Sequence, residues 1–570
     1  MRIRHISVRN FRGIRELDWP VPDRNVICLV GRGDSTKSTI LEALRRVFHP
    51  QWNLSFDDAD FHLCNPESLI TIEVVLGDLP DTFRDLEKYG HSLCGWNAGT
   101  LARTDDPGDG LEDALRIRLT VAEDLEPAWT VIKSDDDEGA PFKPSDRAKV
   151  AVSLIGAISD RHLTWSRGSI LSQLTETENI TSSLADAARA AKAAFEDRRA
   201  ADLTSFDDVA GTAETTARAL GVNVAASYKA HLDSDAINVR MAGLALHDGD
   251  MPLRQLGLGS KRMLTTGLQK QALRQPHITL FDEVEVGLEP HRIARLLHHL
   301  KDDNTGQYLL TTHSPVVLRE LTVADLHIVH GDGGRIDVVA ANKPAIADSI
   351  QGKIRAGAEA FLAPKIVVCE GATEVGFLRG LDDHWVAAEN KDSFAYRGVA
   401  LFDASGASKI KEIAETLNAL GYDVAVLADS DEPVQFSDEH ARELRNAGII
   451  VAKWDGALSI EERVFADLPW AGVMASFAAA RAIWNEDARL LDQVQTQFGE
   501  GFDRDIAAWV ETPQLRTALG KAAKASDWFK RQSWGREWAA AISGHLGDNA
   551  IGESDLVRQL TSLRGWIDNV

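Results

Sequence analysis

A buried strand, a glycine-rich loop and a helix follow one another near the start of the sequence, and this unit constrains the fold more than any other feature. The strand is the continuous apolar run Val26–Val30, a pattern typical of strands that are covered on both faces. The helix that follows carries apolar residues at helical spacing between Ile40 and Val47. A strand that leads into a helix in this way predicts an α/β domain.

The loop between them matches the phosphate-loop pattern G-x-x-x-x-G-K-[ST], except that Thr36 replaces the second glycine. In this pattern backbone N–H groups and the helix N-terminus hold phosphates. Lys37 would neutralise the β- and γ-phosphates of ATP, and Ser38 would bind Mg²⁺. The Cβ of Thr36 restricts the loop, so we expect slow ATP hydrolysis but persisting nucleotide binding. The predicted nucleotide-binding residues of the loop are Gly31, Gly33, Asp34, Ser35, Thr36, Lys37, Ser38 and Thr39.

Two motifs further along the chain supply groups that ATP hydrolysis needs. An apolar strand-like run ends in Asp282, which suits the magnesium shell, and Glu283, which suits activation of water. His313 follows another short strand-like run and is expected to sense the γ-phosphate. The order and spacing favour these roles over the alternative, in which His313 is an ordinary surface or core histidine.

A glycine-rich segment at 256–262 precedes both motifs and lies at the expected start of a helix. It is similar to the signature loop of ABC ATPases, which reaches the ATP of a partner subunit, and Gly259 is the residue assigned to that contact. An ordinary helix N-terminus is the competing interpretation.

A second acidic motif begins where the apolar run 366–369 ends in Glu370, with Glu374 one helical turn later. The next strand-like run ends near Asp429 and Asp431, whose side chains share a face of an extended chain. Because parallel strands bring their carboxyl ends together, these four carboxylates are predicted to converge. Such oxygen ligands suit Mg²⁺ or Mn²⁺, and two metals would clamp a phosphodiester.

Several charged residues are possible additions to this acidic site. Asp403 follows another strand-like run and is a further acidic candidate. Either Glu461 or Glu462 could complete the metal shell, and Glu462 is the residue we predict to do so. Favourable charge at a helix N-terminus is an equal explanation for the two glutamates. Lys530, with Arg531 next to it, lies in a basic and aromatic stretch and is predicted to stabilise the transition state; a solvated helix face is the alternative.

The composition indicates three to four domains in 570 residues and excludes a membrane span, because no apolar run approaches 18 residues. No signal peptide is visible, and four scattered cysteines favour a reduced, cytoplasmic protein. The net charge of -24 argues against broad coating of nucleic acid but permits a local basic groove.

The composition and the apolar patterning divide the chain into four parts. Residues 1–160 and 231–350 are predicted to form an ABC-type ATPase domain in two pieces. An alanine-rich helical insertion at 161–230 is either a dimerisation region or a lid on its own domain. Residues 360–570 alternate strands and helices, which predicts a parallel sheet, and end in a tryptophan-rich helical region.

The motifs up to His313, together with the opening 10–13 (Asn-Phe-Arg-Gly), resemble the ABC ATPases of the SMC and recombination-repair group. The E-G-x-x-E and D-x-D motifs resemble the Toprim domain. Their order in one chain is similar to the OLD (overcoming lysogenization defect) family, and the Gabija nuclease subunit shares this layout. The resemblance implies pairing of two ATPase heads, metal-dependent cleavage or nicking of DNA, defence against phage, and a helicase-like partner in some systems.

Two classes of function remain open. The first is a DNA endonuclease controlled by ATP. The second is a repair or recombination ATPase whose Toprim domain is only a scaffold, although a scaffold would tend to lose the four carboxylates. A topoisomerase would need a tyrosine nucleophile in a winged helix, and none of the five tyrosines has that context. A primase would need a template-binding module that the sequence lacks.

Overall fold

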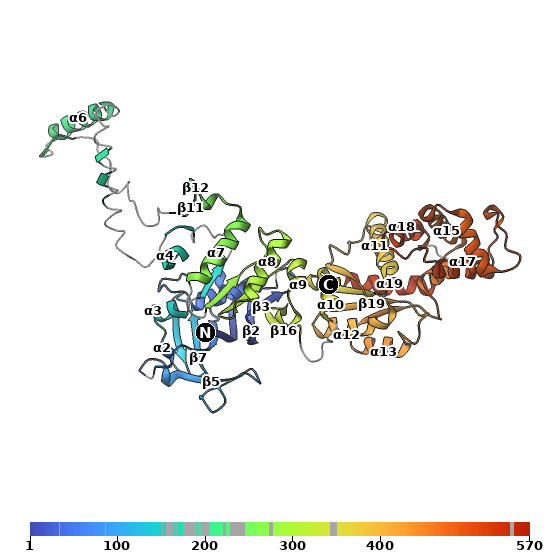
Figure 1. Cartoon of the computed structure of the whole chain (residues 1–570), viewed down its shortest axis with the longest axis horizontal. Coiled ribbons are helices and arrows are strands. Elements are labelled where there is room, and N and C mark those ends of the chain that lie inside the picture. The colour runs from blue at the N-terminus through green and yellow to red at the C-terminus, as the bar shows by residue number, and fades with distance from the viewer. Residues whose placement is uncertain are drawn as a thin grey trace.

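The computed structural model contains two α/β bodies, one built from the N-terminal half of the chain and the other from the C-terminal half (Figure 1). The structure describes the following residues: 1–33, 35–85, 87–150, 152–155, 163–165, 169–174, 186, 189–190, 193–194, 204–220, 224–228, 245–272, 277–342, 350–547 and 552–569.

The N-terminal body is built on a large mixed sheet, whose parallel part has the strand order β10-β13-β14-β3-β15. The bounds of these strands are Val152–Ile155, His277–Phe281, Gly306–Thr311, Val26–Val30 and Leu326–Asp332. Residues of β3 alternate between two cores: Ile27 and Leu29 pack on the side of α1 (Lys37–Val47), and Cys28 packs on the side of α8 (Pro290–Lys301). The strand is therefore covered on both faces, as its apolar run predicts.

The sheet continues into a mainly antiparallel part through β16-β2-β1-β4-β7, with β5, β6, β8 and β9 at its far edge. These strands are Arg335–Ala340, Ile14–Pro20, Arg2–Phe11, Ile70–Gly77 and Glu112–Val121, then Leu93–Asn97, Ala102–Thr104, Pro127–Ile132 and Ala140–Pro141. One face of this part packs against α1. The remaining helices and strands of this half are α2 (Asp81–Arg84), α3 (Pro144–Arg147), α4 (Ile170–Leu174), α6 (Thr204–Ala219), α7 (Leu258–Ala272), α9 (Pro315–Glu320), β11 (His247–Asp248) and β12 (Met251–Pro252).

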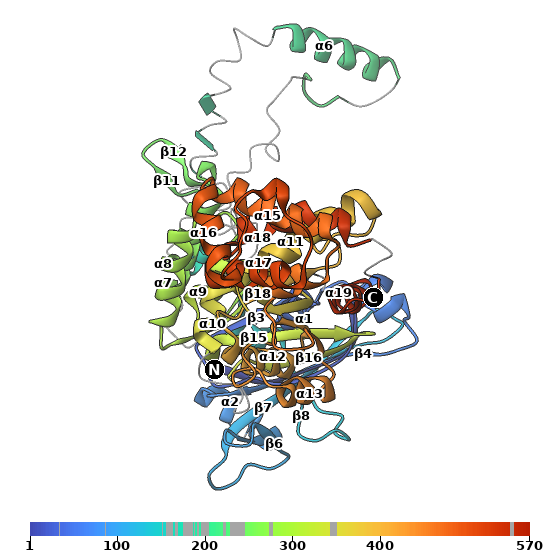
Figure 2. The same ribbon diagram turned by 90° about the vertical axis from the view of Figure 1, so that its right-hand side faces the viewer.

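About half of the predicted helical insertion at 161–230 lies outside the described residues. Its described part includes α6, which lies away from both bodies in the two views (Figures 1 and 2). The prediction that this region is a dimerisation element stays a prediction.

The C-terminal body contains a four-stranded parallel sheet with the order β18-β17-β19-β20. The strands are Val399–Asp403, Lys365–Cys369, Asp423–Ala428 and Ile450–Lys453. Its helices are α10 (Ile350–Ala356), α11 (Ala372–Glu389), α12 (Ile410–Ala419), α13 (Asp438–Asn446) and α14 (Ile460–Asp467). Helices α12 and α13 cover one face of the sheet, and α11 and α14 cover the other. The predicted arrangement of two α/β parts, the second with a parallel sheet, is confirmed.

Five further helices complete the C-terminal body: α15 (Trp470–Trp484), α16 (Asp487–Phe498), α17 (Pro513–Ala525), α18 (Gln532–Ile542) and α19 (Asp555–Asp568). Helices α11 and α18 approach so closely that side chains would not fit at their contact. A Cβ on Gly376 would lie 2.3 Å from the carbonyl oxygen of Gln532, and one on Gly535 would lie 2.6 Å from that of Thr373. This contact fixes the start of α18 beside the start of α11.

The two bodies share one apolar core. Cys28 and Leu310 of the N-terminal sheet belong to the same buried cluster as Ile366, Val368 and Val426 of the C-terminal sheet. All four cysteines are free thiols, and none of the described helices is long and apolar enough to span a membrane.

Candidate functional site

The phosphate loop leaves the carboxyl end of β3 and turns into α1 at Lys37. Thr36, the residue before the helix, has φ +63°, the left-handed conformation that favours glycine. Thr36 therefore occupies a backbone position where a Cβ is strained. Its hydroxyl donates to the carbonyl of Ser35 (2.6 Å). Asp34, also predicted to bind nucleotide, lies outside the described residues.

Lys37 is buried and folds back over its own loop. Its Nζ donates to the carbonyl oxygens of Gly31 (2.9 Å) and Arg32 (2.8 Å) and to Oγ of Ser35 (3.0 Å). The ammonium thus sits inside the ring of loop residues, where phosphates would be held. Gly33 and Thr39 complete the described loop; a Cβ on Gly33 would meet no atom within 4 Å.

Ser38 and Asp282 meet at the predicted magnesium position, although they are far apart in the sequence. The Ser38 hydroxyl donates to Oδ1 of Asp282 (2.8 Å), and the Thr311 hydroxyl donates to the same oxygen (2.7 Å). The contact arises because β3, β14 and β13 are neighbours in a parallel sheet, so their carboxyl ends share one edge.

Glu283 and His313 lie on the same edge of the sheet, and both are exposed. The backbone N–H of Glu283 donates to the Thr311 hydroxyl (2.8 Å), and Glu283 has φ +47°. Glu285, which sequence reasoning missed, accepts from the Thr312 hydroxyl and from the backbone N–H of His313 (both 2.7 Å). It therefore fixes the turn that carries the histidine.

Gly259 lies in the first turn of α7, so the glycine-rich segment does open a helix. A Cβ at this position would lie 2.1 Å from the carbonyl oxygen of Gly287, in the loop after Asp282. Close packing thus accounts for this glycine. Arg262, three residues on, is buried and donates to the carbonyl of Asp282 (2.5 Å). Contact with a partner's nucleotide stays a prediction.

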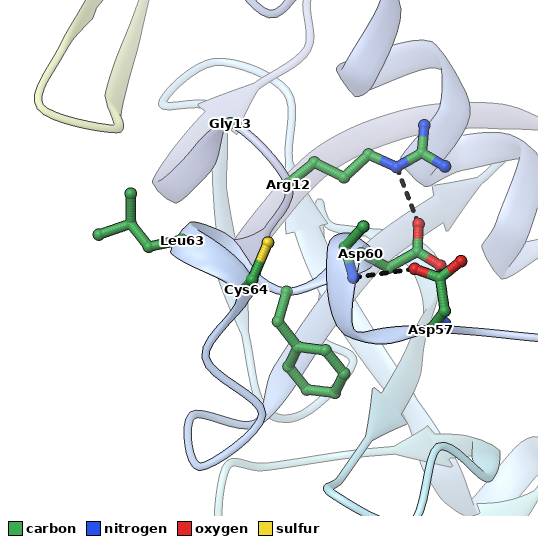
Figure 3. A pocket seen from close by; sticks show the side chains of 8 residues that line it. Arg12, Gly13, Asp57, Asp60, Leu63 and Cys64 are labelled. Carbon is green, nitrogen blue, oxygen red and sulfur yellow. Dashed lines mark hydrogen bonds and ion pairs between the residues drawn. The ribbon is translucent and has the colours of Figure 1, made fainter.

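A cavity of about 500 Å³ opens beside the phosphate loop (Figure 3). It is lined by the turn between β1 and β2 and by the segment 57–64. In Figure 3 Arg12 points toward Asp60, and its Nε donates to Oδ1 of that residue (2.9 Å). The cavity adjoins the loop, because a Cβ on Gly13 would lie 2.9 Å from Cγ2 of Thr36.

Three carboxylates converge at the carboxyl edge of the C-terminal sheet. Glu370 follows β17, and Asp429 and Asp431 follow β19; one oxygen of each lies within 4.8 Å of the others. Burial, reinforced by the charge of Asp431, raises the pKa of Glu370 to about 7. Burial and the surrounding glutamates also hold the pKa of Asp429 well above its usual range. Closely spaced, partly desolvated oxygens of this kind fit a divalent cation, which would relieve their repulsion.

Glu374 lies beside this trio rather than within it. Its side chain is buried, and Oε2 accepts from the backbone N–H of Gly371 (2.7 Å) at the start of α11. Burial, followed by the charges of Glu461 and Glu370, raises its pKa to about 8. The structure therefore brings three of the four predicted carboxylates together, and the fourth, Glu374, lies next to them as a helix cap.

Two side chains that sequence reasoning missed contact the aspartates. Nε1 of Trp454 donates to Oδ1 of Asp429 (2.9 Å), which orients that carboxylate. Nζ of Lys524, on α17, pairs with Oδ2 of Asp431 and lies 3.9 Å from Oε2 of Glu462. No short-range motif marks either residue, since both reach the site only through tertiary packing.

Of the remaining acidic candidates, one lies close to the carboxylate trio and the others accept hydrogen bonds from nearby backbone N–H groups. Glu461 is buried, and its charge acts on both Glu374 and Glu370. Glu462 accepts from the backbone N–H of Ser459 (3.1 Å) as the cap of α14 and faces Lys524. Asp403 accepts from the backbone N–H of Ser405 (2.7 Å) and does not belong to the carboxylate trio.

In the basic and aromatic stretch before α18, the aromatic side chains are buried and the lysine is exposed. Trp528 and Phe529 are fully buried, and Phe529 stacks on Trp538 with ring centroids 4.2 Å apart, so these aromatics belong to the core. Lys530 is exposed and pairs with Asp527 (3.0 Å). The hydrogen bond to Asp527 raises the pKa of Lys530, and the charges of Glu461 and Glu374 raise it further. The ammonium of Lys530 therefore lies in the electrostatic field of the acidic site.

Three family models match separate parts of the chain. Residues 1–93 match an AAA ATPase domain, and residues 134–319 match an AAA domain described as a putative AbiEii toxin of a type IV toxin–antitoxin system. Residues 361–431 match the Toprim domain of overcoming-lysogenization-defect-like proteins, and this match includes Glu370, Glu374, Asp429 and Asp431. None of the curated proteins matches the chain.

Solved structures with similarity to this chain include heads of SMC proteins. The SMC head domain from Thermotoga maritima is 17% identical, with 60% of this chain and 99% of that chain covered and a TM-score of 0.29. An SMC head bound to the C-terminal winged-helix domain of ScpA is 15% identical, with 60% and 97% covered and a TM-score of 0.35. An SMC head with an extended coiled coil from Pyrococcus furiosus is 12% identical, with 59% and 95% covered and a TM-score of 0.32.

Proposed function

We propose that this chain, whose parts match AAA ATPase domains and an OLD-like Toprim domain, is an OLD-family, metal-dependent DNA endonuclease controlled by nucleotide in its ATPase domain. The observation that carries the proposal is the convergence of Glu370, Asp429 and Asp431 at the carboxyl edge of the Toprim sheet. A scaffold domain has no need for three desolvated carboxylates that repel one another.

The chemistry of this site follows from its oxygen donors. Mg²⁺ or Mn²⁺ bound there would polarise a phosphodiester and lower the pKa of a water molecule. Glu370, Asp429 and Asp431 would hold the metal, with Glu374 and either Glu461 or Glu462 completing the shell directly or through water. Trp454 keeps the Asp429 carboxylate oriented. Lys530 would donate to the phosphate oxygens as negative charge develops on them.

Nucleotide binding in the ATPase domain would control DNA cleavage. Lys37 and the loop amides would bind the phosphates, Ser38 and Asp282 would hold Mg²⁺, and Glu283 with His313 would act on the attacking water. The cavity beside Thr36 would take the nucleoside. Because Thr36 is strained, ATP would act more as a switch than as a rapidly hydrolysed fuel.

The wider assignments rest on the family resemblance. We assign residues 1–160 and 231–350 to the ATPase, 161–230 to an inserted dimerisation region and 360–570 to the Toprim nuclease with its helices. DNA, a second copy of the chain and in some systems a helicase-like protein would be its partners, in defence against phage.

The test is nicking of supercoiled plasmid by the purified full chain in Mg²⁺ or Mn²⁺ over a range of ATP. Wild type should convert the plasmid to nicked or linear DNA, and Glu370→Gln should lose this activity by about 100-fold or more. Glu553→Gln makes a matched change at an exposed position before α19, outside the carboxylate site, and should cut normally. Absence of cutting by wild type in either metal, or equal cutting by Glu370→Gln, would reject the proposal and favour the scaffold alternative.

A further inference from the structure

The antiparallel part of the N-terminal sheet has one polar face, and a cavity of about 670 Å³ lies on it. Residues of β4 alternate: Ile72 and Val74 pack into the core with α1, whereas Thr71 and Glu73 line the cavity. Of the described residues of the phosphate loop, none lines this cavity. It is therefore a site separate from both the nucleotide loop and the Toprim carboxylates.

Two arginines of β7 share one buried carboxylate at the floor of this cavity. Glu73 accepts from Nη2 (2.5 Å) and Nε (3.1 Å) of Arg116 and from Nε of Arg118 (2.6 Å). Glu73 and Arg116 are each 8% exposed. Two guanidinium groups and one carboxylate leave a net positive charge, which is costly to bury without a further anion.

Asp135 supplies that anion from the loop between β8 and β9. Its carboxylate lies 2.5 Å from Nη2 of Arg116 and 3.8 Å from Nη2 of Arg118, yet its side chain is 75% exposed. The hydrogen bond from Arg116 lowers the pKa of Asp135. Nη1 of Arg116 is buried with no hydrogen-bond acceptor among the described residues. Arg116 therefore still has an N–H group without an acceptor, and of the two described carboxylates that pair with these arginines, the exposed one is held on a loop.

We propose that this cavity binds a phosphate group, with Arg116 and Arg118 as donors and Asp135 as an internal stand-in that the ligand displaces. Guanidinium groups bind phosphate with paired N–H donors, which a single exposed carboxylate only partly uses. Arg9 and Arg103 also line the cavity, but each is paired with a carboxylate (Glu16 and Asp105), so the donors for a ligand are those of Arg116 and Arg118. In a chain with a net charge of -24, such a local site is where a phosphate-bearing ligand can dock. The phosphate comes either from the DNA backbone or from a free nucleotide.

The test measures binding with the full chain in EDTA, so that it does not depend on nuclease activity. A fluorescent 30-base-pair duplex and a fluorescent ATP analogue are titrated separately, and anisotropy gives each dissociation constant. Asp135→Asn, on an exposed loop, should tighten binding of the true ligand by about threefold. Arg118→Ala should weaken it by about tenfold. Arg84→Ala removes the same charge from α2, outside the cavity, and is the control.

The two ligands separate the sources of the phosphate. If Asp135→Asn tightens and Arg118→Ala weakens binding of the duplex, the site contacts nucleic acid. If the two variants change binding of the ATP analogue in this way, the site takes a free nucleotide. Either pattern supports the proposal. If neither ligand responds to the two variants differently from Arg84→Ala, the proposal is overturned. Asp135→Asn alone decides the matter if Arg118→Ala proves to be misfolded by circular dichroism.

Discussion

His330 and Leu420 join the two halves of the molecule: Nε2 of His330, on β15, donates to the carbonyl oxygen of Leu420, 2.5 Å away, at the end of α12. The neighbouring residue, Gly331, accepts from Nη2 of Arg32 in the phosphate loop (3.3 Å). Leu420 leads into β19, whose far end carries Asp429. The nucleotide loop and the carboxylate trio are thus connected through one histidine and one strand.

This connection predicts that His330→Ala uncouples the two activities. The variant should still hydrolyse ATP and cut DNA, because His330 touches neither set of reacting groups. The effect of ATP on the cutting rate should shrink, and a coupling of 1–3 kcal/mol would correspond to about 5- to 150-fold. The measurement is the cutting rate with and without ATP. His299→Ala, an exposed histidine on α8, is the control, and an unchanged ATP effect in His330→Ala would refute the connection.

The left-handed backbone of Thr36 predicts that Thr36→Gly strengthens nucleotide binding. A non-glycine residue in this conformation costs about 1 kcal/mol or more, so removing the Cβ should improve affinity by about fivefold. Calorimetric titration with Mg²⁺ and a non-hydrolysable ATP analogue measures the change. Thr36→Ala keeps the Cβ and loses the hydroxyl, so it should show no gain. Equal behaviour of the two variants would assign the effect to the hydroxyl and not to the backbone.

The pairing of Lys524 with Asp431 predicts that this lysine competes with the metal. Its ammonium is partly exposed, so the pair is worth about 1 kcal/mol or less, and Lys524→Gln should tighten Mn²⁺ binding by up to about fivefold. Titration of Mn²⁺ followed by electron paramagnetic resonance measures the affinity. Lys521→Gln, an exposed lysine on the same helix, should leave it unchanged. Weaker Mn²⁺ binding by Lys524→Gln would show that the lysine supports the metal instead.

The raised pKa values of Glu370 (about 7) and Glu374 (about 8), caused mainly by burial and then by neighbouring carboxylates, predict a pH dependence. Both values lie above that of an unfolded glutamate, so the folded chain binds more protons, and this stabilisation is lost as the pH rises through 7 to 8. In EDTA the melting temperature should fall between pH 6 and pH 9. Mg²⁺ should restore more stability at pH 9, since the deprotonated carboxylates are its ligands. Glu374→Gln should flatten this profile, and an unaltered profile in that variant would contradict the assignment.

The parts of the site that lie at strand ends could be predicted from the sequence. Glu370, Asp429 and Asp431 each follow an apolar run, and parallel strands bring such residues to one edge. The same argument places Ser38 beside Asp282. In both cases a short local pattern and one rule of sheet geometry are sufficient.

The parts that depend on helix packing could not be predicted. Lys524 reaches Asp431 because α17 lies close to α14, where a Cβ on Gly520 would be 3.0 Å from Cα of Glu462. Trp528 and Phe529 stand next to Lys530 in the sequence, but both fill the core. Which face of a helix is buried depends on partners far away in the chain, and no local pattern records them.

We propose that one metal site, built from Glu370, Asp429 and Asp431, cuts DNA. The most direct measurement compares two Mn²⁺ titrations of the same protein: the binding isotherm and the single-turnover cutting rate on plasmid DNA. Both titrations should have the same midpoint, and Asp431→Asn should move both midpoints to higher Mn²⁺ concentration together. Cutting that reaches its maximum before the site fills, or that keeps its midpoint in Asp431→Asn while binding weakens, would contradict this proposal.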